Sequence, residues 1–437
     1  MMRLIMLLAV LVSCAGAAQA GEPPSRYGVD APELARLGKD AVGVRTLHFV
    51  QHGQVDVLAF DPVKGSAPVA DRNLTVDLWY PARMPPGAAP ETYTAQLPSE
   101  PPAPPVRFSV PGIAVRDAPP SGMHLPLVIV SHGYSNDPAA MTWLTENLAS
   151  KGYVVAAIHH DDPPITDRIR FVEPLMRRPL DIAFVAQTLQ STLAAERLID
   201  PARIALIGYS MGGYGVLTAA GAVLDPEGRA AKMVPGGLML PFARGGAMRA
   251  AIAVKGLRAV VAISPAGGGS LGSWGEEGVR GITAPLLLIA GDNDKTVDYK
   301  TGALAFFEQA VNSHRYLLTF KEGGHAIGLS PAPDAMRSLL WDQDWFEDPV
   351  WRKQRVTAIN AHFITAFLDR YVKDDESRAA YLNVPTADSD AGVWTAATPP
   401  LPYDAYSPAT ADITVWKGFQ RNHATGLQLL QAQARAP

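Results

Sequence analysis

Five short, continuous apolar runs in the middle of the chain restrict its fold more than any other feature. They cover residues 127–130, 154–158, 204–207, 259–263 and 286–290. Apolar runs of this length without alternation are typical of strands buried on both faces, as in parallel sheets. Stretches with helical periodicity lie between several of these runs. Strands that alternate with helices predict an α/β fold with a mostly parallel, doubly wound sheet.

Helix signals support this alternation. Asp137 can cap a helix whose first turn contains Pro138, and Gly152 follows its expected end. Apolar residues recur at helical spacing over residues 179–196 and again over residues 356–372. We therefore expect one helix after the first apolar run, a second before the third run, and a closing helix.

The hydrophobic pattern and the composition are different in the segments before and after the five apolar runs. Residues 46–60 and 74–80 have period-two character, which predicts antiparallel strands. Residues 81–126 are rich in proline, alanine and serine, so we expect an extended connection that winds over the surface. Residues 316–320 predict one further strand.

The sequence GYSMG at residues 208–212 follows the third apolar run and precedes a run of small residues. A serine between two glycines at a strand-to-helix corner is typical of a nucleophile elbow. The glycines permit a tight backbone that exposes the serine oxygen. Because the bare pattern arises by chance in roughly one chain of this length in seven, Ser210 is a candidate nucleophile only if a base and an acid follow it.

The base candidate is His325, which follows two glycines after the strand expected at residues 316–320. A serine nucleophile needs a base to take its proton, and in this order of elements the histidine comes last. His362 and His423 are weaker candidates for the base, because His362 falls on an expected helix and His423 in the C-terminal tail.

The acid candidate lies in the sequence GDND at residues 291–294, directly after a buried run. A carboxylate is needed to hold the tautomer of the base. We expect Asp294 to take this role. Asp292 lies so close to the strand end that it can instead fix the turn through its own backbone.

The loop after the first buried run is placed to supply oxyanion donors. Acyl transfer needs N–H groups aimed at the developing negative charge. We expect the backbone N–H groups of Tyr134 and Met211 to serve, with His132 ordering the loop. The Tyr134 ring can form an aromatic wall beside the substrate, or it can simply pack at the surface.

A metal site at residues 159–162, whose sequence is HHDD, is the less favoured interpretation. Imidazole and carboxylate groups are suitable ligands. Adjacent residues at a strand end point in opposite directions, however, so they rarely chelate together. A serine triad needs no metal, and we expect no cofactor.

The first residues are typical of an export signal. Arg3 precedes an apolar stretch at residues 4–12, which is too short to span a membrane, and residues 18–20 form a small-x-small cleavage site. We expect a periplasmic or secreted protein. The alternative is a lipoprotein anchored through Cys14, because LVSC resembles the lipoprotein box. A net charge of −4 without a basic stripe disfavours nucleic acid as a partner.

The expected organisation is one hydrolytic domain flanked by a leader and a tail. The leader covers residues 1–20 and the domain residues 21–382, with cap-like insertions at about 222–255 and 326–352. We expect residues 383–437 to lie along the domain surface. Disorder of this proline-rich tail is the competing view.

Aromatic residues cluster in the second insertion. Trp341 and Trp345 are candidates for binding an acyl chain, because large rigid apolar side chains near a site hold such groups. The alternative is that they form the small core of a lid.

Several segments together carry a family resemblance. Those that resemble the α/β-hydrolase superfamily are SHGY at 131–134, the elbow with Gly213, DKTV at 294–297 and GH at 324–325. Within it, VDLWYP at 76–81 is similar to the platelet-activating-factor acetylhydrolase and predicted dienelactone hydrolase group. The likeness spans about residues 42–382.

This resemblance implies an esterase with Ser210, Asp294 and His325 as its triad, acting on a lipid or other short-acyl ester. Dienelactone hydrolases carry cysteine at the elbow, so Ser210 makes lactone cleavage the least favoured activity. The elbow also resembles that of bacterial cutinases and polyester hydrolases, which are usually shorter and often carry a disulfide. A catalytically silent, lipid-binding hydrolase fold is the alternative from another functional class.

Overall fold

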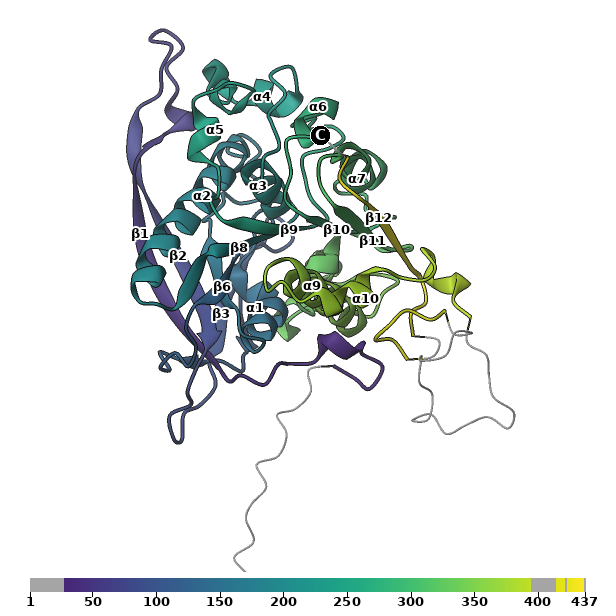
Figure 1. Cartoon of the computed structure of the whole chain (residues 1–437). Coiled ribbons are helices and arrows are strands. Elements are labelled where there is room, and N and C mark those ends of the chain that lie inside the picture. Colours follow the sequence, from purple (N-terminus) through teal and green to yellow (C-terminus); the bar gives the residue numbers. More distant parts are fainter. Residues whose placement is uncertain (1–26, 394–413, 421–422, 436–437) are drawn as a thin grey trace, which may run out of the picture.

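A computed structural model describes residues 27–393, 414–420 and 423–435 (Figure 1). The expected leader, with Cys14, lies outside the described residues. The strands are β1 (Val42–Val55), β2 (Val69–Pro81), β3 (Thr92–Leu97), β4 (Val106–Pro111), β5 (Val115–Arg116), β6 (Leu125–Ser131), β7 (Val154–His159), β8 (Ile199–Tyr209), β9 (Leu257–Ile263), β10 (Leu286–Gly291), β11 (Arg315–Phe320) and β12 (Leu427–Ala432).

The helices occupy the connections between the strands. They are α1 (Thr142–Ala149), α2 (Val172–Ala195), α3 (Met211–Ala219), α4 (Arg229–Met233), α5 (Met248–Ala251), α6 (Gly275–Val279), α7 (Ala305–Gln309), α8 (Leu340–Phe346), α9 (Lys353–Tyr371) and α10 (Ala379–Leu382). Among the described residues, no helix combines the length and the apolar composition needed to cross a membrane.

A central sheet organises the molecule. Within the described residues it has the strand order β12-β11-β10-β9-β8-β6-β7-β2-β1-β5. Strands β7, β6, β8, β9, β10 and β11 run parallel, whereas β2 and β12 are antiparallel to their neighbours β7 and β11. The predicted mostly parallel sheet is confirmed, together with the antiparallel pair near the N-terminus.

Helices cover both faces of this sheet (Figure 1). Helices α2 and α3 pack on one face, while α1 and α9 pack on the other. The chain passes from β6 to β7 on one side and then returns to β8 on the other side of β6. The strand order therefore reverses between β6 and β8. In open α/β sheets this is the point at which ligands bind, at the carboxyl ends of the strands.

Helix α2 begins at Val172, earlier than the predicted residue 179. Proline inside a helix removes one hydrogen bond, which is why the sequence pattern predicts Pro179 at the helix start. Here the Leu175 carbonyl, which Pro179 cannot bind, accepts a hydrogen bond from the Tyr214 hydroxyl of α3 at 2.8 Å. The helix therefore continues through the proline.

Residues 81–126 do not simply wind over the surface, as the composition predicts. They contain the antiparallel pair β3 and β4, whose inward side chains join the core. The Tyr93 hydroxyl binds Trp79 Nε1 at 2.7 Å and Glu146 Oε1 at 2.8 Å. The surrounding prolines obscure the alternation of apolar and polar residues over 92–97. The contacts of Tyr93 with Trp79 and Glu146 are not predictable from the sequence, because both partners are distant from Tyr93 along the chain.

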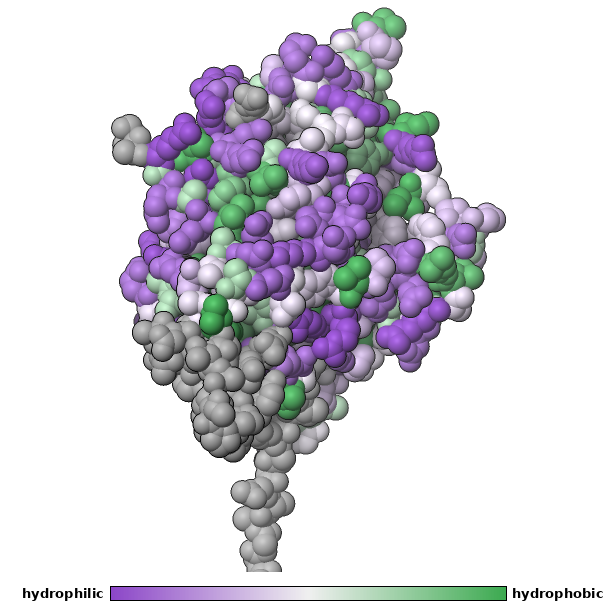
Figure 2. All heavy atoms as spheres, turned by 90° about the vertical axis from the view of Figure 1, so that its right-hand side faces the viewer, coloured by the Kyte–Doolittle hydropathy of each residue, from purple (hydrophilic) through white to green (hydrophobic). Residues whose placement is uncertain are grey.

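The C-terminal tail contributes to the sheet. Strand β12 pairs antiparallel with β11 over its whole length, and Trp416 and Phe419 are buried against α9 residues such as Phe363. The sequence pattern indicates only a surface segment. On the side of the molecule that includes this edge, hydrophobic residues are scattered among hydrophilic ones (Figure 2). Residues 394–413 of the predicted tail lie outside the described residues.

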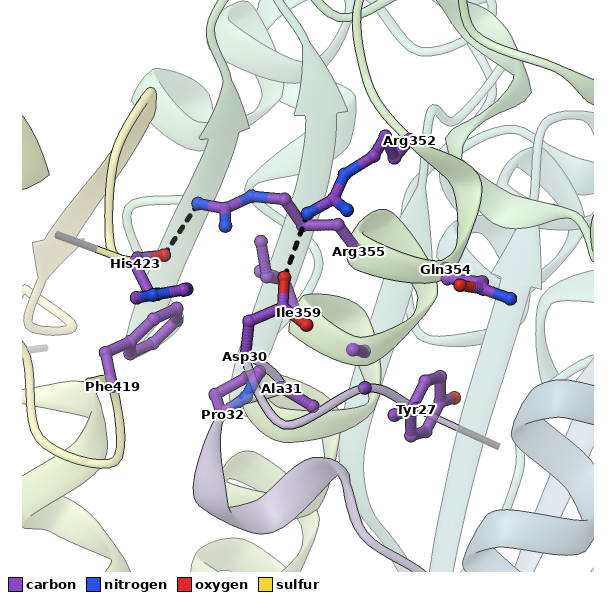
Figure 3. Close-up of a pocket in the computed structure, with 12 residues that line it drawn as sticks. Tyr27, Asp30, Ala31, Pro32, Arg352, Gln354, Arg355, Ile359, Phe419 and His423 are labelled. Atoms are coloured by element: carbon purple, nitrogen blue, oxygen red, sulfur yellow. Dashed lines mark hydrogen bonds and ion pairs between the residues drawn. The ribbon is translucent and has the colours of Figure 1, made fainter. Parts of the chain in front are cut away.

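Polar contacts connect the first and last described segments to the start of α9 (Figure 3). Arg352 donates to Asp30, in the segment before β1, at 2.9 Å. Arg355 donates to the backbone carbonyl of His423, just before β12, at 2.6 Å. The described parts of the two terminal segments therefore belong to the same packed unit as the sheet.

We predict that the Tyr214→Phe variant loses about 1–3 kcal/mol of unfolding free energy, because the buried Leu175 carbonyl loses its donor. The double variant Tyr214→Phe with Pro179→Ala should lose less, since alanine in place of the proline supplies the missing backbone N–H. Urea denaturation of the wild type, both single variants and the double variant measures the coupling. Additive effects would contradict this account of α2.

Candidate active site

Ser210 lies on a strained turn between β8 and α3. Its backbone has φ 53° and ψ −114°, which is unfavourable for a residue with a side chain. A Cβ on Gly212 would collide with the Ser131 carbonyl, and one on Gly208 would collide with the carbonyl of Gly212. Both glycines of the pentapeptide are therefore required by the close approach of the turn to β6 and to itself.

The structure brings Ser210, His325 and Asp294 together from the ends of β8, β11 and β10. Ser210 Oγ lies 3.0 Å from His325 Nε2, and His325 Nδ1 lies 2.8 Å from Asp294 Oδ2. Asp294 accepts only, so His325 carries its proton on Nδ1 and Nε2 is free to accept from the serine. This is the hydrogen-bond order of a serine triad.

Asp294 is held in its charged form. Burial opposes ionisation, but hydrogen bonds from His325 and from the backbone N–H groups of Val297 and Thr296 outweigh burial and lower the pKa of Asp294. Asp292 has another partner, since its Oδ1 accepts from the Glu322 backbone N–H at 2.6 Å. Asp294 therefore contacts the histidine, whereas Asp292 binds the backbone after β11 and not, as the sequence predicts, that of its own turn.

Four side chains hold the loop that carries His325. They bind four consecutive carbonyl groups: Tyr209 donates to the carbonyl of His325, Lys353 to that of Ala326, Asn360 to that of Ile327 and Trp143 to that of Gly328. These donors come from β8, α9 and α1. Sequence reasoning missed all four, because no local pattern links them to His325.

The predicted oxyanion loop lies beside Ser210. Strands β6 and β8 are paired, with Ser131 opposite Gly208, so the residues that follow them are adjacent. A Cβ on Gly133 would lie 3.4 Å from the Ser210 Cβ. Tyr134 and Met211, the two expected donors, both border the cavity into which Ser210 opens. His132 Nδ1 lies 2.7 Å from the Gly133 carbonyl oxygen, in keeping with an ordering role.

The cavity next to Ser210 has a volume of about 470 Å³ and mostly apolar walls. Trp341 and Trp345 of α8, the two tryptophans predicted to bind substrate, line it together with Tyr134. Their indole rings lie 5.2 Å apart, and the Tyr134 ring packs edge-on against Phe171 at 5.2 Å. The volume suits a small organic ligand. Sequence reasoning missed the lining residues Ile165, Phe171, Leu271 and Leu329.

The histidines of the HHDD segment have protein partners. His159 binds Asp77 at 2.9 Å, and His160 lies between Ser131 and Asp181 at 2.9 and 2.8 Å. The described residues hold no group of three or more metal-ligating side chains. Ser131, His160 and Asp181 form a second Ser–His–Asp chain, and all three are buried.

The order of strands and the Ser–His–Asp geometry define an α/β-hydrolase fold with a serine triad. Residues 118–235 match a family model described as PETase, PET hydrolase-like. This segment holds the oxyanion loop and Ser210 but ends before Asp294 and His325. The fold also resembles a ferulic acid esterase from Streptomyces cinnamoneus, with a TM-score of 0.52 and 22% identity over 80% of this chain and 94% of that one.

Two curated relatives show local sequence similarity. Cutinase est2 of Thermobifida alba is 35% identical over 91 residues, which are 21% of this chain and 28% of the relative. Cutinase 2 of Thermobifida cellulosilytica is 36% identical over 91 residues, 21% of this chain and 32% of the relative. The chain thus spans about a third or less of each relative's length.

We predict that a fluorophosphonate reagent labels Ser210 and leaves Ser131 unmodified. Both serines have a histidine partner, but only Ser210 opens into the cavity. Peptide mapping by mass spectrometry locates the adduct. Labelling of Ser131, or equal labelling of the Ser210→Ala variant, would contradict the assignment.

Proposed function

We propose that the protein is a carboxylic ester hydrolase that acts through an acyl-enzyme on Ser210. The observation that carries this proposal is the Ser210–His325–Asp294 hydrogen-bond chain at the wall of an apolar cavity. The family model and the cutinase matches support the same chemistry over residues that include the elbow.

In the proposed mechanism His325 Nε2 takes the proton of Ser210, whose Oγ attacks the ester carbonyl. The Tyr134 and Met211 N–H groups stabilise the tetrahedral oxyanion. His325 then gives its proton to the leaving alkoxide, and an acyl-serine remains. Water, deprotonated by His325, attacks the acyl-serine. The tetrahedral intermediate collapses as His325 returns the proton to Ser210 Oγ, which releases the carboxylic acid and restores free Ser210. Asp294 stabilises the histidinium in both steps.

The substrate class we propose is that of the cutinase and polyester hydrolase alternative. The matches to cutinases and to a PET hydrolase-like model favour this alternative over the platelet-activating-factor acetylhydrolase interpretation. The aromatic walls of the cavity, formed by Tyr134, Phe171, Trp341 and Trp345, suit an apolar or aromatic acyl group. A silent lipid-binding fold is disfavoured, since no member of the triad is missing.

We predict that Ser210→Ala lowers kcat for p-nitrophenyl acetate by at least about 10⁴-fold. Asp294→Asn should lower kcat by about 10³- to 10⁴-fold, because His325 loses the carboxylate that sets its tautomer. Asp292→Asn is the matched control and should cost less than about tenfold. Initial rates of the three variants provide the test, and equal rates for wild type and Ser210→Ala would exclude the catalytic proposal.

We predict that Trp341→Ala and Trp345→Ala each lower kcat/KM for p-nitrophenyl octanoate about tenfold and for the acetate less than about threefold. The longer chain loses apolar contact at about 0.8 kcal/mol per buried CH₂ group, whereas the acetyl group has little to lose. Leu340→Ala is the control, because Leu340 is exposed on the same helix. Equal losses on both esters would instead indicate that the tryptophans form the core of a lid.

A further inference from the structure

Arg178 is a buried cation directly behind the oxyanion loop. Its side chain is fully inaccessible, although arginine is rarely buried without a specific partner. Nη1 donates to the Ser131 hydroxyl at 3.0 Å and to the His132 carbonyl at 2.5 Å. Nη2 donates to the Gly133 carbonyl at 3.0 Å and to Asp162. One guanidinium from α2 therefore binds three consecutive residues of the loop.

The bond to the Gly133 carbonyl sets the direction of the Tyr134 N–H. Both groups belong to one peptide plane, and in a trans peptide they point in opposite directions. The described cis peptide is at Pro101–Pro102, so the Gly133–Tyr134 peptide is trans. Because Arg178 of α2 holds this carbonyl, the Tyr134 N–H points away from the Arg178 guanidinium. Tyr134 borders the cavity into which Ser210 opens.

Asp162 fixes the far end of the loop and compensates the charge of Arg178. Its Oδ2 accepts from the Arg178 guanidinium and from the Ser135 backbone N–H at 2.9 Å. Residues 131–135 are thus bound through side-chain or backbone atoms before and after Tyr134. This leaves the Tyr134 peptide little freedom to rotate.

The second Ser–His–Asp chain anchors the same arrangement. Arg178 only donates, so the Ser131 hydroxyl accepts its hydrogen bond. When His160 is neutral with its proton on Nδ1, it donates to Asp181, and its Nε2 accepts the proton of Ser131. Burial, followed by the charges of Arg178 and Arg72, lowers the pKa of His160 well below its usual range, in agreement with this neutral form.

Arg72 completes the chain from the opposite end. Its Nε and Nη2 both bind the Asp181 carboxylate at 2.8 Å, and Nη2 also donates to the His160 carbonyl at 2.6 Å. The hydrogen bonds that link Arg178, Ser131, His160, Asp181 and Arg72 therefore each have a defined donor and acceptor. Ser131 in this chain is a structural hydroxyl rather than a second nucleophile.

We propose that Arg178 is a positioning residue for the reaction: by binding the His132 and Gly133 carbonyls it aims the Tyr134 N–H at the oxyanion formed on Ser210. The inference rests on the proposed ester hydrolysis and deepens it. Arg178 acts through the loop and does not touch the substrate. Removing it should weaken stabilisation of the transition state more than binding of the ester.

The test compares Arg178→Met, Arg178→Lys and a control, Arg177→Met, on p-nitrophenyl acetate. We expect Arg178→Met to lower kcat by about 10²- to 10³-fold, the effect of losing one oxyanion donor, with KM changed less than about threefold. Lysine keeps a donor for one carbonyl, so kcat of Arg178→Lys should exceed that of Arg178→Met by at least about tenfold. Arg177 pairs with Glu173 on the same helix rather than with the loop, so its variant should keep the wild-type kcat.

The outcomes separate this inference from the proposed function. An inactive wild type would overturn ester hydrolysis itself. An active wild type with an unchanged kcat in folded Arg178→Met would overturn only the role of Arg178, as would a higher KM at constant kcat. If Arg178→Met does not fold, as judged by circular dichroism, Arg178→Lys and Asp162→Asn decide, because both should lower kcat selectively. A normal kcat in these two variants would overturn the inference.

Discussion

The close approach of the Ser210 turn to the end of β6 is the constraint on which the site depends. Gly212 lies so near the Ser131 carbonyl that a side chain at position 212 would push the turn after β8 away from the loop after β6. The proposed nucleophile and the loop expected to supply oxyanion donors are therefore brought together by backbone packing at the point where the strand order reverses. The parallel register of β10 and β11 then delivers Asp294 and His325 to the same edge.

Backbone carbonyl groups are prominent among the points at which the protein holds the two loops of this site. The His325 loop is bound through four consecutive carbonyls, and the oxyanion loop through those of His132 and Gly133. In the oxyanion loop, the bond to the Gly133 carbonyl turns the N–H of the same peptide, that of Tyr134, away from Arg178. Preorganised donors of this kind need no rearrangement as charge develops, which is the basis of electrostatic catalysis.

Local signals in the sequence predict the buried strands and the order of the triad residues. The apolar runs predict strands β6 to β10, and chain order predicts that Ser210, Asp294 and His325 meet. Long-range contacts decide the rest. In helix α2, Pro179 leaves the Leu175 carbonyl without its helical donor, and Tyr214 of α3 binds that carbonyl instead. Strand β12 exists because the edge of β11 is available to it.

The supporting residues of the site are hidden from sequence reasoning for the same reason. Arg178 lies in a helix whose start the proline pattern misplaces, and Lys353 and Asn360 belong to a helix that is predicted only as a packing element. Nothing in their immediate neighbours distinguishes them from surface residues. Their roles follow from burial and from the carbonyls they bind, which only the folded chain reveals.

Ester hydrolysis by this site requires Ser210 to carry the acyl group during turnover. Rapid acid quenching of the wild type during p-nitrophenyl acetate hydrolysis, followed by peptide mass spectrometry, detects such an intermediate. We expect an acetyl adduct on the peptide that contains Ser210, which decays when the ester is exhausted. Turnover without an adduct at Ser210, or with an adduct on another residue that decays at the turnover rate, would contradict it.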